Sequence, residues 1–203
     1  AIGGQSSDNI TSGDYNLTIG YQQDPSSATA DYQMNIGGGI YGQDAYSDGA
    51  ISQVGVGTTA PKVKLDVHHN PTNLANDTGG GEVVTFGTGS LTTGKLYYLN
   101  TSGVWTLTDA DVTTAGGSQL LGIALGSSAS SNGVLLRGFF DMTTYLSGTF
   151  NEGIPVYVHT NPQGNITVTQ PSGTNDFVRV VGYCTNTANV IYFNPDGTYI
   201  KLA

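Results

Sequence analysis

The residues with the greatest potential for chemistry are few and scattered along the chain. Asp109 and Asp111 are two positions apart, so on a strand both carboxylates would lie on one face, where they could form an acid/base pair or bind calcium. The segment around them, residues 107–117, has the composition of a loop and no second acidic cluster is near in sequence. Asp in such loops commonly accepts a hydrogen bond from a nearby backbone N–H. We therefore predict a turn-forming role for this pair.

The histidines could bind a metal or act as general bases. His68 and His69 follow Asp66, but adjacent residues on a strand point to opposite faces and cannot both bind one ion from one chain. Three copies of one histidine could meet on the axis of a trimer, although a solvated strand end is the simpler interpretation. His159 is the only histidine after residue 81, and no Gly-x-Ser-x-Gly elbow accompanies it. The sequence predicts no metal site, no cofactor and no catalytic residue.

Two arginines interrupt apolar strands and are candidates for a structural charge. Arg137 and Arg179 each lie within a run of aliphatic and aromatic residues. A buried charge must be paired, or it costs several kcal/mol. Asp141, Glu152 and Asp176 are the candidate partners, from the same subunit or another one. The alternative is that both guanidinium groups face water.

The composition excludes several classes of protein. Charged residues make up 10% of the chain, which has 30 Gly and 12 Tyr among 203 residues and a net charge of −9. Six Lys and Arg cannot supply the clustered positive charge of a nucleic-acid-binding surface. No apolar run approaches the roughly 20 residues of a membrane helix, so we expect no membrane insertion. The one cysteine, Cys184, lies in an apolar run, and we expect a buried thiol.

The first 50 residues contain an internal repeat. Residues 13–20 align with residues 30–37 at a shift of 17 positions, and the same shift places Ile19-Gly20 on Ile2-Gly3. Repeats of this size are typical of stacked supersecondary units. One unit offers a single short strand and cannot bury a core alone, so stacking and packing against identical chains are expected. We predict a Gly-rich β-roll or β-prism shaft that is trimeric and, with its neck, extends over residues 1–67.

The end of this region and the segment after it indicate a domain boundary. Val63, Leu65 and Val67 alternate with polar residues, which predicts a half-buried strand. Residues 68–81 have the composition of a linker and end in three glycines. The chain begins without an initiator Met or a visible targeting signal, a pattern we interpret as that of a fragment or processed product.

Residues 82–203 show the spacing of an all-β domain. Short apolar runs recur about every dozen residues, which favours an antiparallel β-sandwich or barrel over alternating strands and helices. No segment has sustained helical periodicity, so we predict little or no helix. The predicted strands are residues 82–87, 95–99, 104–108, 119–125, 133–140, 154–159, 164–169, 177–184, 189–193 and 198–202.

Three stretches resemble fibre proteins of phages. The Ile-Gly repeats resemble the β-roll heads of trimeric adhesins and the repeat-bearing shafts of phage fibres. Residues 54–67 are similar to a Val-Gly-x-Gly-Thr-Thr-x-Pro-x-x-Lys-Leu-x-Val signature of tail fibres and repetitive bacterial surface proteins. The distal region resembles the C-terminal tip domain of fibres from phages of marine bacteria, through segments such as 94–98 (Gly-Lys-Leu-Tyr-Tyr) and 191–198 (Ile-Tyr-Phe-Asn-Pro-Asp-Gly-Thr).

The resemblance implies a homotrimeric attachment protein on the virion surface that binds a host cell-surface glycan or protein. A bacterial trimeric surface adhesin is one alternative, and a polysaccharide-degrading tailspike is another, although such enzymes usually carry a much longer β-helix. We expect ligand contact through loops and exposed aromatics of residues 82–203. Trp105, Tyr145 and Phe150 are the candidates, and burial in the β-core is the alternative for each.

Overall fold

The computed structural model describes residues 1–43, 53–68 and 71–203, and it confirms an all-β fold. The chain divides into two units, residues 1–69 and 70–203, which we call the shaft unit and the distal unit. The division falls inside the predicted linker of residues 68–81. His69, considered above as a metal ligand, lies outside the described residues.

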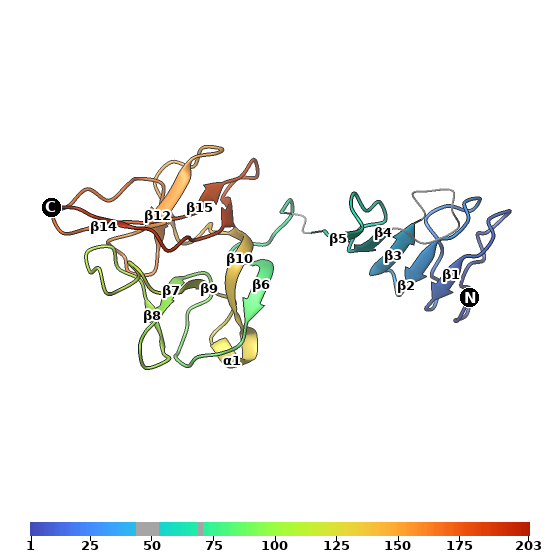
Figure 1. Cartoon of the computed structure of the whole chain (residues 1–203), viewed down its shortest axis with the longest axis horizontal. Coiled ribbons are helices and arrows are strands. Elements are labelled where there is room, and N and C mark those ends of the chain that lie inside the picture. Colours follow the sequence, from blue (N-terminus) through green and yellow to red (C-terminus); the bar gives the residue numbers. More distant parts are fainter. Residues whose placement is uncertain (44–52, 69–70) are drawn as a thin grey trace. The chain divides into compact units, whose positions relative to one another are not determined.

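The shaft unit is built on one five-stranded sheet in the order β1-β2-β3-β4-β5 (Figure 1). Pairs β1–β2 and β4–β5 are parallel, whereas β2–β3 and β3–β4 are antiparallel. The strands are β1 (Leu17–Ile19), β2 (Met34–Ile36), β3 (Ile40–Gln43), β4 (Gln53–Val56) and β5 (Leu65–Val67).

The internal repeat is confirmed as two stacked coils. Ile19 pairs with Ile36 in the parallel β1–β2 ladder, and Ile2 pairs with Ile19 in a parallel bridge. Contacts between the coils keep the same spacing, because the Asp14 N–H donates to Asp31 Oδ1 at 2.6 Å across 17 residues. Each coil is therefore one turn of the chain that hydrogen-bonds to its own copy.

The predicted strand after residue 62 forms, but its burial is the reverse of the expectation. Leu65 and Val67 of β5 are 63% and 58% exposed, and Val63 just before it is 58% exposed. Asp66, between them, is only partly exposed. The alternation is present because a strand turns each successive side chain to the opposite face, but in this chain the polar face is the covered one.

The distal unit is built on a curled ten-stranded sheet that forms half of a barrel. Its strand order is β11-β13-β12-β15-β16-β10-β9-β7-β8, with β6 added on β10, and a separate pair is formed by β14 and β17. The elements are β6 (Gly79–Val84), β7 (Leu96–Leu99), β8 (Trp105–Leu107), β9 (Leu121–Ala124), α1 (Ala129–Asn132), β10 (Val134–Asp141), β11 (Leu146–Ser147), β12 (Pro155–Val158), β13 (Ile166–Thr167), β14 (Phe177–Val178), β15 (Val180–Cys184), β16 (Val190–Phe193) and β17 (Ile200–Lys201).

Strand β10 organises this sheet because it is long enough to serve three neighbours. Its first residues pair with β9 and its last ones with β16, while β6 lies along its other edge (Figure 1). The main core of the distal unit packs against the inner face of these strands, with Phe140, Phe177 and Phe193 fully buried. A smaller cluster around Trp105 and Tyr97 fills the end near α1.

Gly79–Gly81 are part of strand β6, whereas their composition predicted a linker. They are strand because β6 approaches β10 very closely. A Cβ on Gly81 would overlap the main-chain oxygen of Arg137, and one on Gly79 would overlap that of Phe139. Glycine is therefore needed here because it lets two backbones approach closely, and not because it makes the chain flexible. The short elements α1 and β11 were also missed, since two to four residues carry no readable periodicity.

Candidate functional site

A polar groove runs along one side of the distal unit, between the loop after β8 and the loop between β12 and β13. It consists of two hollows of about 540 Å³ and 520 Å³ that share Leu107, Asp109 and Gln163. The first is lined also by Ser90, Thr92, Tyr97, Tyr98, Trp105, Thr106, Val112 and Ala115, and the second by Lys95, Asp111, Thr160, Asn161 and Pro162. We refer to the two together as the groove.

Main-chain hydrogen bonds hold the two loops that border the groove. Gly164 N–H donates to the Thr108 oxygen at 2.9 Å, and Ala110 N–H donates to the His159 oxygen at 3.1 Å. Thr108 and Ala110 are fully buried. The loop after β8 is thus fixed at both of these positions, so the side chain between them, Asp109, has a defined place.

Asp109 joins the two loops through its carboxylate. Its Oδ1 accepts the Asp111 N–H at 3.0 Å, and its Oδ2 accepts a hydrogen bond from Gln163 Nε2 at 2.7 Å. The first contact is an Asx turn, which confirms the turn-forming role predicted for Asp109 and Asp111. The second fixes the Gln163 amide, since its nitrogen must face Asp109. Gln163 is itself exposed, so its amide is held in place where a ligand can reach it.

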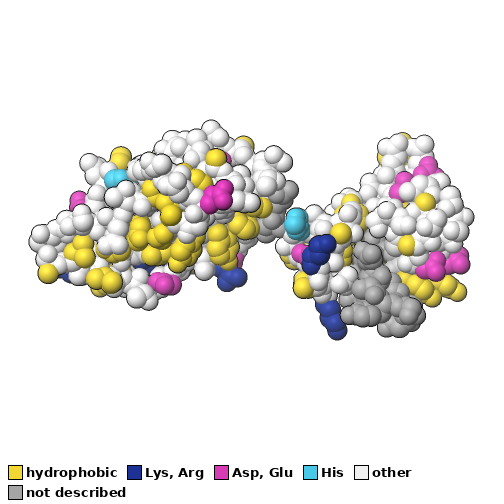
Figure 2. Space-filling view, turned by 90° about the horizontal axis from the view of Figure 1, so that it is seen from above, with side chains coloured by type: hydrophobic (Ala, Val, Ile, Leu, Met, Phe, Trp, Pro, Cys, Tyr) yellow, Lys and Arg dark blue, Asp and Glu magenta, His cyan; other side chains and the backbone are white. Residues whose placement is uncertain are grey.

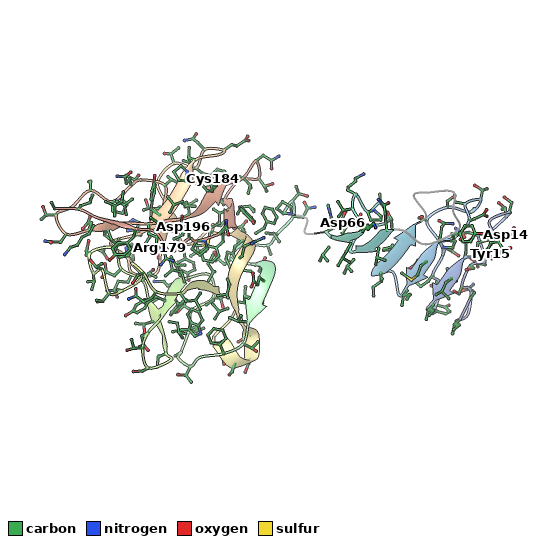
Figure 3. The ribbon with its side chains drawn as sticks, viewed as in Figure 1. Asp14, Tyr15, Asp66, Arg179, Cys184 and Asp196 are labelled. Atoms are coloured by element: carbon green, nitrogen blue, oxygen red, sulfur yellow. The ribbon has the colours of Figure 1, made fainter. Side chains whose placement is uncertain are left out.

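Arg179 anchors the far end of the same loop. The residue is 4% exposed, and its Nη1 donates to the oxygens of Gly116, Gly117 and Gln119 at 2.7, 3.1 and 2.7 Å. Its Nε donates to the Asp196 oxygen at 2.8 Å, and Figure 3 shows these two residues together within the unit. Loss of hydration lowers the pKa of Arg179, while the Asp196 charge opposes this effect.

The two interrupting arginines therefore differ. Arg179 is buried, and its guanidinium donates to main-chain oxygens rather than to the carboxylates of Asp141, Glu152 or Asp176 that were expected from the sequence. Such oxygens satisfy the guanidinium because it offers five donors in a plane. Arg137 is exposed on β10, opposite Glu82 of β6, so for this residue the solvent-facing alternative holds.

Beside the groove, the carboxyl group of Asp111 lies near those of Asp109 and Asp176. The pKa of Asp111 is raised by partial loss of hydration, then by the Asp109 charge, and then by a side-chain hydrogen bond with Asp176. His159 lies near enough for its charge to oppose this rise, and burial lowers its own pKa. Asp176 and His159 line a further hollow of about 320 Å³ together with Thr160, Thr167, Thr169, Gln170, Pro171, Ser172 and Gly173.

The aromatic residues singled out from the sequence are less exposed than expected. Trp105 is 2% exposed on strand β8, where its Nε1 donates to the Phe86 oxygen at 2.8 Å. Its indole belongs to the smaller core cluster, so the burial alternative holds for this residue. Tyr145 and Phe150 lie in loops and are half-buried against the main core, and Lys95 Nζ sits 5.6 Å from the Tyr145 ring centroid.

An outward-facing aromatic row on the sheet was missed. Phe139 of β10 pairs across strands with Tyr192 of β16, which pairs with Tyr183 of β15. The Phe139 and Tyr192 rings are 5.3 Å apart, and Tyr183 is 49% exposed. Figure 2, viewed from the side where β12 and β15 lie in Figure 1, shows a band of hydrophobic side chains on this unit. The sequence signal that could have revealed this row is an aromatic residue at the outward-facing position of β10, β15 and β16.

Other sequence-derived residues are placed as follows. Cys184 is 4% exposed and burial raises the pKa of its thiol, which confirms the expected buried cysteine. Within residues 1–43, 53–68 and 71–203, no three His, Cys, Asp or Glu residues are arranged to hold a metal ion. The four-residue α1 is the one helix in the described part of the chain, where no helix has the length and apolarity of a membrane span.

Comparison with known proteins gives no relative for this chain. No protein-family model matches it, and no curated protein or solved structure matches it significantly.

Proposed function

We propose that this chain is the distal segment of a virion attachment fibre and that the groove binds a neutral host cell-surface glycan. The observation that carries the proposal is the pairing of Asp109 with Gln163, which holds an exposed amide beside the half-buried Tyr98 ring. Amide groups and aromatic faces are the two kinds of group that recognise the hydroxyls and the flat faces of sugars.

The rest of the groove lining favours a neutral ligand. Threonine and serine hydroxyls, from Ser90, Thr92, Thr106 and Thr160, add uncharged donors and acceptors. Lys95 is the one cation among the lining residues of the groove, and its Nζ donates to the main-chain oxygen of Gln163 at 2.9 Å. The carboxylates of Asp109 and Asp111 outnumber the single Lys95 ammonium, so a strongly anionic ligand would meet net negative charge in the groove.

Binding is a better fit to this geometry than hydrolysis. The two carboxyl groups of a retaining glycosidase are about 5 Å apart and those of an inverting one are farther apart, to leave room for a sugar carbon or a water. In the groove, both oxygens of the Asp109 carboxylate instead accept hydrogen bonds, from the Asp111 N–H and from Gln163 Nε2, so this carboxylate is held in a structural role. We propose on this ground that the chain attaches to a glycan rather than degrading it, in contrast to a tailspike.

The proposed assembly is a homotrimer, in which three weak glycan sites act together. Three linked sites raise the overall affinity through effective concentration, with no new contact. A bacterial trimeric adhesin would use the same arrangement.

The test compares a groove variant with one control and one variant of a rival surface, in glycan-array and host-cell binding assays. Gln163→Ala removes the held amide from an exposed position and should weaken binding about tenfold per site, the effect of roughly 1.4 kcal/mol. Asn186→Ala, which removes an exposed amide between β15 and β16, should leave binding unchanged. Tyr183→Ala tests the aromatic row as the rival surface.

Two results would contradict the proposal. Loss of binding in Tyr183→Ala with full binding in Gln163→Ala would transfer the ligand to the aromatic row. Release of reducing sugar from host polysaccharide, abolished by Asp111→Asn, would establish the degrading alternative.

A further inference from the structure

The sheet of the shaft unit carries two in-register rows of apolar side chains on one face. The first row crosses six chain segments through successive pairs between neighbouring strands. The second lies two residues away along each strand. The first row is Ile2, Ile19, Ile36, Ile40, Val56 and Val67, and the second is Leu17, Met34, Val54 and Leu65, with Gly42 on β3 between Met34 and Val54. We call these two rows the apolar face.

The opposite face of the same sheet is polar and is covered by the unit's own chain. Thr18 is fully buried and hydrogen-bonds to Ser6 at 2.9 Å and to Ser7. Asn35 is 4% exposed, and its Nδ2 donates to the Asp24 oxygen at 2.6 Å. The turns of the stacked coils thus lie over the polar side chains, and they leave the apolar face on the other side.

This arrangement is the reverse of an ordinary soluble domain. Ile2 and Leu65 are 64% and 63% exposed, and Ile40 and Val56 in the middle of the sheet are 39% and 38% exposed. Among the described residues, both apolar core clusters belong to the distal unit. Figure 3 shows side chains projecting below β1–β5, with Asp66 on the other side. Burial of apolar side chains is the main source of folding stability, and the shaft unit lacks it as long as its apolar face contacts water.

We propose that the apolar face is the surface through which copies of this chain pack against one another. Six aliphatic side chains of the face are 38–64% exposed, and together they form a continuous apolar surface of the kind that marks a protein–protein interface. Its rows contain no charged residue, no aromatic ring and no side-chain hydrogen-bonding group, so they offer nothing to recognise a glycan. A surface of aliphatic side chains is complementary to another of the same kind.

A second copy is also the partner that the folding of the unit requires. Because the shaft unit buries polar groups and exposes apolar ones, its folded state needs another surface that buries the apolar face. Identical chains are always present in the needed ratio, and closed symmetric assemblies of identical chains are the commonest oligomers. This inference rests on the proposed homotrimer and assigns its contact surface, and it is independent of the glycan groove.

The first test measures the mass of the full chain by light scattering. The wild type should have three times the chain mass. Ile40→Asn and Val56→Asn, changed together at the centre of the apolar face, should yield monomers. Tyr21→Asn, at a residue that is 66% exposed and outside the two rows, should keep the trimer mass. Glycan binding by single distal units should persist in the monomers with reduced avidity.

The second test does not require a polar substitution that could unfold the shaft unit. The chain has one cysteine, Cys184, which is buried, so introduced thiols react against a clean background. Under mild oxidation, variants with a single Ile19→Cys, Ile40→Cys or Val56→Cys change should include at least one that forms covalent dimers. Tyr21→Cys should form none.

The outcomes separate the two proposals. A monomeric wild type would overturn both the trimer and the assigned face, and it would leave another occupant, such as a lipid surface or a different protein. A wild-type trimer that keeps its mass in the Ile40→Asn, Val56→Asn variant, with no cross-linking on the face, would overturn the face alone. Loss of glycan binding in Gln163→Ala bears on the groove and not on this surface.

Discussion

Tyr15 stacks on Tyr32, the residue one coil further along the chain, with ring centroids 5.0 Å apart and ring planes 7° from parallel. Both residues have left-handed backbone conformations, with φ of 59° and 53°. Tyrosine rarely adopts this conformation, since its Cβ crowds the backbone. The repeat therefore reproduces an unfavourable backbone angle as well as a hydrogen-bond register, and the ring stack is one interaction that offsets its cost.

Removing this stack should destabilise the shaft unit by a modest amount. We expect Tyr32→Ala to lower the free energy of unfolding by about 1 kcal/mol, the size of an aromatic pair beyond its burial. Tyr32→Gly should cost less, because glycine accepts the positive φ without strain. Thermal unfolding measures both, and Tyr21→Ala, at an exposed tyrosine with no stacked ring partner among the described residues, is the control. An Ala variant as stable as wild type would show that the stack contributes nothing.

The two arginines form a matched pair for a test of the distal unit. Arg179→Met removes the donor to the main-chain oxygens of Gly116, Gly117, Gln119 and Asp196, of which the first two are buried, so we expect a loss of about 2–4 kcal/mol. Arg137→Met, at an exposed position, should change stability by no more than about 0.5 kcal/mol. Urea unfolding followed by the fluorescence of the buried Trp105 reports both. Equal effects of the two changes would contradict the anchoring role assigned to Arg179.

The raised pKa of Asp111 predicts a specific pH dependence. The folded state binds this proton more tightly than the unfolded chain does, so the contribution to stability is present below the unfolded pKa of about 4 and is lost as pH rises through the folded pKa. Asp111→Asn should remove that loss and gain stability relative to wild type between pH 4 and pH 7.

Unfolding midpoints at several pH values test this expectation, with Glu152→Gln as an exposed carboxylate control. His159 acts in the opposite sense, because its lowered pKa removes stability as pH falls below about 6.5. The effect of Asp111→Asn is therefore read as a difference from wild type at each pH. The prediction would be wrong if the stability advantage of Asp111→Asn over wild type became smaller toward neutral pH.

The close approach of β6 to β10 predicts intolerance of any side chain at Gly81. A methyl group there meets the main-chain oxygen of Arg137, and the φ of Gly81 is +156°, so Gly81→Ala should separate the strands locally and cost about 2 kcal/mol or more. Gly103→Ala is a useful comparison, since its Cβ would meet no atom within 4 Å and only its φ of +74° is unfavourable. Amide hydrogen exchange of β6 distinguishes local opening from global unfolding.

The sequence alone determined the class of fold and the places of most strands. Alternation and turn residues predicted nearly every strand of the distal unit, and the shift of 17 residues predicted the pairing of Ile2, Ile19 and Ile36. These features are local or periodic, so they are readable from residue types. The Asx turn at Asp109 and Asp111 was predictable for the same reason, because its donor and acceptor are two residues apart.

Only the tertiary structure decided which face of each strand is covered. Arg137 and Arg179 interrupt similar apolar runs, yet one faces water and the other lies beneath a loop that ends more than 50 residues earlier in the chain. Leu65 and Val67 alternate as core residues do and are exposed, while Trp105 is buried and Tyr183 is not. Alternation separates two faces of a strand but does not say which one another segment covers, because that depends on contacts between residues far apart in sequence.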